Sequence, residues 1–210
     1  QEVIIVGGGM VGLSLALMLA KQNIAVKLLE AIKYPNYDDE NLAPYHSSFD
    51  ARNSALSRRT VQIYQELGLW RALQEHATPI LEVNITEQGS FGKARLKAEQ
   101  EKVESFGQVI ENAWLGRVLL TEVQKQSLIE LIDGVQVTQL TQDADMAYID
   151  ASRGEEQLSL QAKLVIAADG RDSFCRKALG IGASEHDYDQ VAIVTTVQTS
   201  KPHNHVGFER

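Results

Sequence analysis

The sequence has little of several features that mark particular classes of protein. It contains one cysteine, Cys175, which excludes an internal disulfide and fits a reducing compartment; it falls in an expected helix as a small buried residue. No stretch reaches the roughly 18 apolar residues of a membrane span, and no signal peptide is recognised. Acidic residues outnumber basic ones by 28 to 20, with no basic run, so no nucleic-acid partner is expected. We therefore expect a globular, cytoplasmic protein.

The most informative stretch is a short apolar run followed by three glycines. Val3–Val6 is rich in β-branched residues, which predicts a strand buried on both faces of a parallel sheet. Gly7, Gly9 and Gly12 follow with G-x-G-x-x-G spacing. They permit a tight turn, a close approach of the backbone to a diphosphate, and close packing of a helix on the strand. The residues predicted to meet the diphosphate at the helix N-terminus are Gly7, Gly9, Met10, Val11 and Gly12.

A second strand and an acidic residue extend this motif. A helix over 10–22 is followed by a strand over 25–29, and Glu30 ends that strand close to the expected spacing of about 20 residues. A carboxylate there accepts both hydroxyls of an adenosine ribose and repels a 2′-phosphate, which favours FAD or NAD over NADP. The alternative is a glycine-rich turn beside a surface glutamate.

The rest of the chain alternates between helical patterns and short strand patterns. A loop over 31–50, with an acidic run, precedes a helix that Gly68 ends. The patterns predict helices at 57–67, 112–126 and 173–179, antiparallel strands at 81–86, 94–96 and 108–110, a meander at 135–140, 146–151 and 157–160, and a strand at 190–199. The fold class is therefore α/β, with a nucleotide-binding part at 1–78 and 108–182 and a β-rich part at 79–107 and 183–210.

A second apolar run points to the same site. Leu164–Ala168 predicts another buried parallel strand, and Asp169 and Gly170 follow it directly. Ligands of open α/β sheets bind beyond the carboxyl ends of the strands, so this turn and the glycine turn are expected to face one crevice. The alternative is that Asp169 only caps the helix that begins near Ser173.

Three motifs together resemble a known family. They are Val6–Gly12 with Glu30, Asp50–Leu56, and Ala167–Ser173. They resemble the FAD-dependent aromatic hydroxylases of the p-hydroxybenzoate hydroxylase type, in the ubiquinone-biosynthesis branch. The resemblance implies a Rossmann-like FAD-binding domain, with a glutathione-reductase-type βαβ unit and a β-meander, and part of an inserted antiparallel β substrate domain.

The resemblance also implies roles for single residues. Glycines 7, 9 and 12 would hold the FAD diphosphate and Glu30 the ribose. The further implied residues are Arg52 on the flavin side, Arg117 near the diphosphate, and Asp169 and Gly170 beside FAD and the passing pyridine nucleotide. Alternatively, Arg52 is a loop arginine that holds Asp50 in place, and Arg117 is an exposed charge on a helix. No catalytic residue is assigned, and no metal site is expected, because the pair His203 and His205 has no third ligand at suitable spacing.

The implied reaction is hydroxylation of the ring of a polyprenyl phenol by molecular oxygen, with FAD as cofactor and NADPH as transient electron donor. The substrate would be met at a membrane surface or through partners, such as a ubiquinone-biosynthesis complex or a homo-oligomer. Family members are about twice as long and carry a second Gly-Asp motif, so we expect a fragment that is inactive by itself. Two alternatives stay open: an NAD-dependent dehydrogenase, and a non-catalytic subunit of a ubiquinone-pathway assembly.

Overall fold

The structure, a computed structural model, describes residues 2–34 and 49–210. The chain forms two compact units, residues 1–50 with 116–192 and residues 51–115 with 193–210. The boundaries predicted at 78, 107 and 182 differ from these: residues 51–78 and 108–115 lie in the second unit, and residues 183–192 lie in the first. The assignment of one part to the cofactor and the other to the substrate stays a prediction. Most of the expected loop over 31–50 lies outside the described residues.

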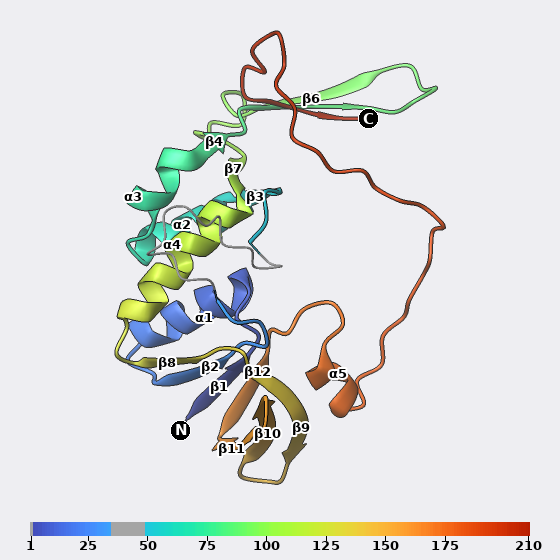
Figure 1. Ribbon diagram of the computed structural model, residues 1–210. Helices are drawn as coiled ribbons and strands as arrows, with labels where there is room; N and C mark the ends of the chain where they lie inside the picture. The colour runs from blue at the N-terminus through green and yellow to red at the C-terminus, as the bar shows by residue number, and fades with distance from the viewer. Residues whose placement is uncertain (1, 35–48) are drawn as a thin grey trace. The chain divides into compact units, whose positions relative to one another are not determined.

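A four-stranded parallel sheet forms the centre of the first unit. Its order is β12 (Leu164–Ala167), β1 (Val3–Val6), β2 (Val26–Leu29) and β8 (Ile129–Ile132). β1 is inside the sheet and buried along its whole length, as its β-branched sequence predicts. Helix α1 (Met10–Lys21) connects β1 to β2, which confirms the βαβ unit (Figure 1). β8 has no counterpart among the predicted strands.

An antiparallel meander packs on this sheet. β9 (Gln136–Gln142), β10 (Ala147–Arg153) and β11 (Glu156–Ala162) pair in the order β11-β10-β9, as predicted (Figure 1). Ile4 and Val6 of β1 contribute one face of the sheet to a common core. The other members of this core are Leu29, Val135, Val137, Leu140, Ile149, Ala151, Ala162 and Cys175. The parallel sheet therefore carries the meander on one face.

Helix α1 covers the opposite face. Side chains of a strand alternate between its two faces, so Ile5 points away from the meander core that holds Ile4 and Val6. A Cβ built on Gly12 of α1 lies 3.6 Å from the side chain of Ile5. The glycine thus brings the first turn of α1 against β1, the close packing that its place in the motif predicted.

The last strand of this unit differs from its prediction in one respect. β12 pairs in parallel with β1, as predicted, but it lies at the edge of the sheet, and Leu164 is 52% exposed. The prediction of a buried strand was wrong, because an apolar run does not show whether another strand will pair along its outer edge. Helix α5 (Phe174–Ala178) follows, with Ser173 as its N-cap accepting a hydrogen bond from the backbone N–H of Arg176 at 2.9 Å.

The second unit contains helices and an antiparallel sheet. β3 (Asn53–Ser57), β7 (Gly107–Glu111) and β4 (Ala77–Pro79) pair in the order β3-β7-β4. The helical elements are α2 (Arg58–Glu66), α3 (Trp70–Leu73), the 3-10 turn η1 (Gln74–His76) and the start of α4 (Asn112–Lys125). Gly68 ends the helical segment with a φ of +78°, as predicted. β3 and β4 were not predicted as strands.

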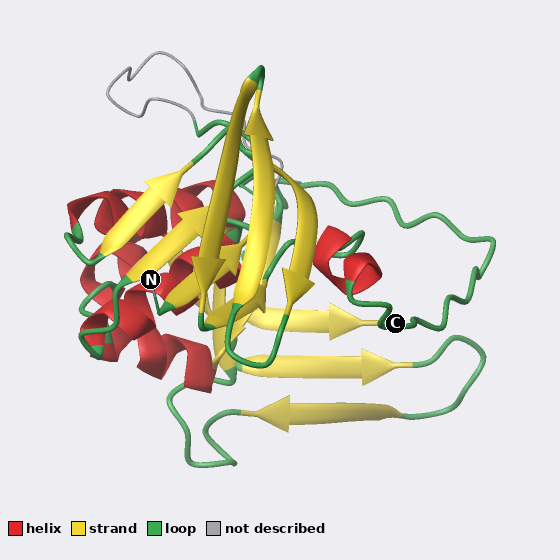
Figure 2. Cartoon of the chain, turned by 90° about the horizontal axis from the view of Figure 1, so that it is seen from below, coloured by secondary structure: helices red, strands yellow, loops and turns green. Residues whose placement is uncertain are grey.

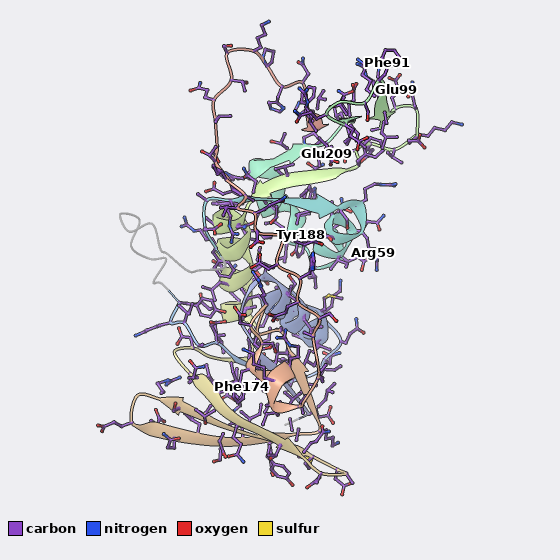
Figure 3. All side chains as sticks on the ribbon, turned by 90° about the vertical axis from the view of Figure 1, so that its right-hand side faces the viewer. Arg59, Phe91, Glu99, Phe174, Tyr188 and Glu209 are labelled. Atoms are coloured by element: carbon purple, nitrogen blue, oxygen red, sulfur yellow. The ribbon has the colours of Figure 1, made fainter. Side chains whose placement is uncertain are left out.

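A second sheet in this unit has a mixed order. β5 (Glu82–Thr86) pairs with β6 (Lys93–Lys97) in antiparallel fashion, and β13 (Val206–Glu209) adds to β5 in parallel (Figure 2). The alternating pattern predicted β5 and β6 but not β13. The side chain of Phe91, in the turn between β5 and β6, is fully exposed (Figure 3).

The expected strand at 190–199 is absent from the structure. These residues form no strand, and their alternating apolar side chains lie in solvent, with Val191 and Ile193 each 92% exposed. The prediction was wrong because alternation produces a strand only where a partner supplies the hydrogen bonds of a ladder. No strand of residues 2–34 or 49–210 pairs with this segment.

Candidate functional site

The glycine turn between β1 and α1 is shaped by backbone contacts. Gly7 has a φ of +104°, which side chains rarely allow, and its N–H donates to the carbonyl of Leu29 at 2.8 Å. A Cβ on Gly7 would collide with the carbonyl group of Ala168, and one on Gly12 would collide with the carbonyl oxygen of Gly7. Glycine at position 7 therefore lets the turns after β1 and β12 come together, and glycine at position 12 lets α1 approach the turn after β1.

The N-terminus of α1 has donors available for a ligand. Gly9 is the N-cap and has no side chain to accept from the first turn. The first N–H groups of any α-helix have no acceptor inside the helix, and the helix dipole makes this end positive. Val11, in the first turn, is 71% exposed, and Met10 is half-buried. The arrangement suits an anionic group such as a diphosphate.

Glu30 lies directly against the glycine turn. Its side chain is only 8% exposed, and its Oε2 accepts a hydrogen bond from the Gly8 N–H at 2.6 Å. Its Oε1 accepts from the Ile32 N–H at 2.8 Å. These two donors fix the orientation of the carboxylate. The alternative of a surface glutamate is excluded.

A cavity of about 340 Å³ opens at the carboxyl ends of β12, β1 and β2. Gly7, Gly9 and Glu30 lie on its wall together with Asp169 and Gly170. The other lining residues are Val6, Leu29, Ala31, Ile32, Val135, Gln136, Val137, Ala168, Asp172 and Phe174. This is the region in which open α/β sheets bind ligands. The two turns that were expected to share a crevice do so.

Asp169 caps the following helix as well as lining the cavity. Its Oδ1 accepts from the Ser173 hydroxyl at 2.6 Å, and its Oδ2 accepts from the Cys175 N–H at 3.0 Å. Burial alone would raise the pKa of Asp169, but the hydrogen bonds from Cys175 and Ser173 outweigh it, so the pKa is below the usual 3.8. Asp169 therefore does cap this helix, and whether it also contacts the cofactor stays a prediction. Gly170 follows with a φ of +83°.

This lowered pKa predicts a pH-dependent contribution to stability. A carboxylate whose pKa is lower in the folded state stabilises that state fully above its unfolded pKa, here about 3.8, and loses this effect as the pH falls through the folded pKa. We expect Asp169→Ala to lower the melting temperature near neutral pH, and the difference from the wild type to shrink below pH ~3.8. Thermal unfolding followed by circular dichroism at several pH values measures it. The control is Asp172→Ala, at an exposed neighbouring residue, which should keep the pH profile of the wild type. If the difference in melting temperature between Asp169→Ala and the wild type did not shrink at low pH, the hydrogen-bonded carboxylate would not be the source of the effect.

Two arginines of the expected site are not among the residues that line this cavity. Arg117 is exposed on α4 and is not among the lining residues. Arg52 is exposed in the second unit, and its carbonyl accepts from the Asn112 N–H at 2.8 Å. Roles for both beside a cofactor stay predictions. Conversely, sequence reasoning missed Tyr34, whose hydroxyl donates to the Gly8 carbonyl at 2.5 Å. Its position in a tyrosine-containing loop gave no signal.

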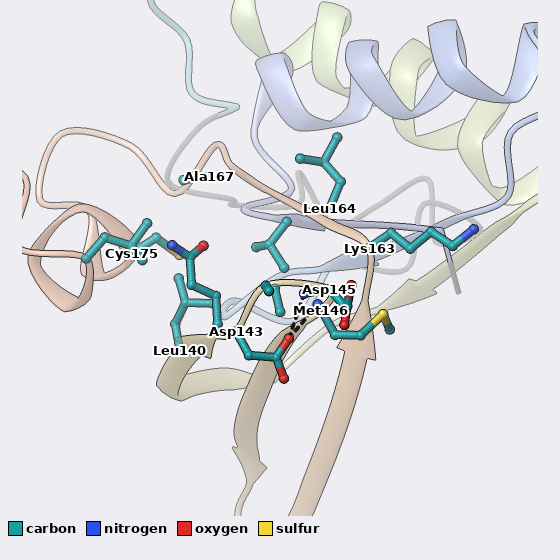
Figure 4. A pocket seen from close by; sticks show the side chains of 13 residues that line it. Leu140, Asp143, Asp145, Met146, Lys163, Leu164, Ala167 and Cys175 are labelled. Carbon is teal, nitrogen blue, oxygen red and sulfur yellow. Dashed lines mark hydrogen bonds between the residues drawn. The ribbon is translucent and has the colours of Figure 1, made fainter.

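A second cavity, of about 280 Å³, lies between the β9–β10 turn, β12 and α5 (Figure 4). Cys175 on its wall is fully buried, and this burial, with the negative charge of Asp169, raises the pKa of the thiol to about 12. The thiol is therefore unreactive, as expected for a structural cysteine. The Oδ1 of Asp143, also on its wall, accepts hydrogen bonds from the N–H groups of Asp145 and Met146.

A third cavity, of about 430 Å³, belongs to the second unit. His203 and His205 lie on its wall with His76 and Glu111. His203 and His205 are exposed, and the Nδ1 of His203 accepts from the His205 N–H at 3.1 Å. In the described residues, no group of three or more His, Cys, Asp or Glu side chains has metal-binding geometry. Nor does any helix of the described part combine the length and apolar character needed to cross a bilayer.

Comparisons with known proteins agree with this geometry. The sequence matches the family described as FAD binding domain over residues 1–208. The ubiquinone hydroxylase UbiL of Rhodospirillum rubrum is 32% identical over 96% of this chain and 44% of its own length. The 3-demethoxyubiquinol 3-hydroxylase of Escherichia coli is 32% identical over 94% of this chain and 48% of its own length. The chain thus spans less than half the length of these relatives.

Solved structures share the fold. The OxyS anhydrotetracycline hydroxylase of Streptomyces rimosus superposes with a TM-score of 0.72 at 23% identity, over 89% of this chain and 35% of that one. The flavin-dependent monooxygenase PieE, solved in complex with FAD and substrate, gives a TM-score of 0.69 at 22% identity, over 86% of this chain and 32% of that one. The arrangement of a parallel sheet with one covering helix and a meander is therefore a fold that this chain shares with these two proteins.

Proposed function

We propose, from the premise that this chain belongs to the FAD binding domain family, that it forms the adenosine-diphosphate part of an FAD site. The observation that carries the proposal is the cavity at the carboxyl ends of β12, β1 and β2. It combines an uncapped helix N-terminus, a glycine turn without side chains, and the fixed carboxylate of Glu30. These are the groups that bind a diphosphate and the hydroxyls of a ribose.

Each residue has a separate task in this proposal. Gly9, Met10 and Val11 present backbone N–H groups to the diphosphate, while Gly7 and Gly12 keep the turn compact. Both oxygens of Glu30 accept a backbone hydrogen bond, which fixes the carboxylate in the orientation in which it would meet the ribose hydroxyls. Asp169 and Gly170 also line the cavity.

The larger protein would be a flavoprotein monooxygenase. Its curated relatives include a ubiquinone hydroxylase and a 3-demethoxyubiquinol 3-hydroxylase. We infer that the substrate is a polyprenyl phenol of ubiquinone biosynthesis and that NADPH and oxygen are consumed. Bound FAD would supply the redox chemistry, and the protein would position the ring and exclude water. Three segments, Leu67–Trp70, Gly107–Asn112 and Gly207–Arg210, resemble 2-octaprenyl-6-methoxyphenol hydroxylase in particular.

Access to such a substrate requires contact with a membrane or with a partner that delivers it. A polyprenyl chain is insoluble in water, so the protein would take its substrate at a membrane surface or from a partner of the same pathway. The net charge of −8 does not favour adsorption to anionic lipid. We therefore propose that the protein contacts the membrane peripherally or through a partner. It would do so as part of a ubiquinone-biosynthesis complex or as a homo-oligomer.

Nucleotide titration tests the proposed function. We expect ADP and FAD to compete for one site, and 2′-phosphorylated ADP to bind at least about tenfold more weakly, because Glu30 repels the extra phosphate. Isothermal titration calorimetry gives the affinities, and flavin fluorescence reports the competition. The dehydrogenase alternative is tested in the same series by titrating NADH against FAD, because only that alternative predicts that NADH binds more tightly than FAD.

Two outcomes would overturn the proposal. One is binding of FMN but not of ADP, which would place the ligand contacts at the flavin end. The other is equal affinity for ADP and its 2′-phosphate, which would show that Glu30 does not meet the ribose.

A further inference from the structure

We propose that Tyr34 is a positioning residue for the nucleotide diphosphate. It would act through the peptide between Gly8 and Gly9 without touching the ligand itself. The inference rests on the proposed function, because the diphosphate is that of the adenine nucleotide in the cavity beside Gly9.

The middle glycine of the turn is held from two sides. The hydroxyl of Tyr34 donates to the Gly8 carbonyl oxygen at 2.5 Å, in a buried environment. On the other side, the N–H of Gly8 donates to Oε2 of Glu30 at 2.6 Å. A Cβ on Gly8 would collide with the Tyr34 hydroxyl and lie 3.0 Å from the Cβ of Glu30. The residue between the two motif glycines is thus fixed by the two flanking side chains.

The orientation of one peptide links Tyr34 to the ligand. The carbonyl of Gly8 and the N–H of Gly9 belong to the same peptide group, and in a trans peptide they point in opposite directions. A hydrogen bond that fixes the carbonyl toward Tyr34 therefore fixes the Gly9 N–H away from it. Gly9 lies on the cavity wall and is the N-cap of α1, where the diphosphate is expected.

Tyr34 is itself held in place. Its backbone N–H donates to Oδ2 of Asp133 at 2.8 Å, just beyond the end of β8. Its ring stacks on Phe49, with centroids 6.3 Å apart and planes 14° apart, and its side chain is only 8% exposed. The ring therefore cannot turn away without leaving a packed site. Before any ligand arrives, the hydroxyl already holds the peptide in one orientation, which lowers the cost of ordering on binding.

The competing explanation is that Tyr34 only stabilises the fold. A structural role would weaken binding of every ligand of the site alike, or of none. The positioning role makes a different prediction, because only ligands with a diphosphate use the Gly9 N–H. The dependence of the effect on the ligand therefore separates the two explanations.

The test is Tyr34→Phe, which keeps the ring and removes the hydroxyl. We expect the affinity for ADP to fall about tenfold, the effect of one well-oriented hydrogen bond, and the affinity for adenosine to change less than about twofold. NMR titrations measure both at a temperature where circular dichroism shows the variant to be folded. The matched control is Tyr148→Phe, which removes an exposed tyrosine hydrogen bond to Asp143 of 2.8 Å and should leave both affinities unchanged.

The outcomes separate this inference from the proposed function. Unchanged ADP affinity in Tyr34→Phe, or an equal loss for ADP and adenosine, overturns the positioning role and leaves the adenine-nucleotide site standing. Failure of the wild-type chain to bind ADP overturns both. A tenfold loss confined to ADP supports the inference.

Discussion

Replacement of Gly7 by alanine is expected to destabilise the first unit by about 3–5 kcal/mol and to abolish nucleotide binding. Two costs add at this position. The φ of +104° is unfavourable for any residue with a side chain, and the new Cβ would collide with the carbonyl group of Ala168. To relieve the collision, the turns after β1 and β12 must separate, and the cavity between them changes shape. Thermal unfolding and ADP titration measure the two effects.

A second glycine separates the two costs. Gly154, in the turn between β10 and β11, has a φ of +59°, and no atom lies within 4 Å of a Cβ built on it. Gly154→Ala should therefore show only the backbone cost, about 1 kcal/mol, and normal ADP binding. If Gly7→Ala lost no more stability than Gly154→Ala, the close approach of the two turns would not exist in solution.

Substitution of Glu30 by glutamine is expected to reduce ADP affinity about 100-fold and stability by about 3 kcal/mol. Both carboxylate oxygens accept from backbone N–H groups, those of Gly8 and Ile32. A glutamine amide has only one oxygen, so its NH₂ group would face one of these donors. The buried N–H then loses its acceptor, and the side chain rotates away from the position that a ribose needs.

The ribose contact has its own signature. Wild-type protein should prefer ADP to 2′-deoxy-ADP, and Glu30→Gln should lose this preference. Glu130→Gln serves as the control, since Glu130 forms an ion pair of 2.9 Å with Lys27 but its side chain is 52% exposed. We expect a change within about 0.5 kcal/mol and unaltered nucleotide binding there. A preference for ADP that survived in Glu30→Gln would remove Glu30 from the ribose site.

The core of the candidate site could be predicted because it depends on neighbours in the chain. The glycine spacing after Val3–Val6 and the acid after the second strand are short-range features of one βαβ unit. Their geometric demands, a positive φ at Gly7 and close packing at Gly12, allow little except glycine. The crevice shared with Asp169 was predictable for a similar reason, because parallel strands carry their carboxyl ends to one edge.

Other features could not be read from the chain. The alternating stretch 190–199 looks like β5, but only β5 has a partner strand, so only β5 is a strand. The apolar run of β12 looks like β1, but β12 is an edge strand. Pairing and burial depend on residues distant in the sequence, and a local pattern does not report whether they arrive. β13 was not predicted, and its parallel pairing with β5 comes from the tertiary structure.

Local sequence was thus enough for the class of fold, the turn that would receive a diphosphate, and the acid beside it, since each follows from backbone constraints within one supersecondary unit. The tertiary structure decided the hydrogen bond from Tyr34 to Gly8 and the edge position of β12. These features join residues that are far apart in the chain or lie in irregular loops. Their contacts arise only when the sheet, the meander and the helices pack together.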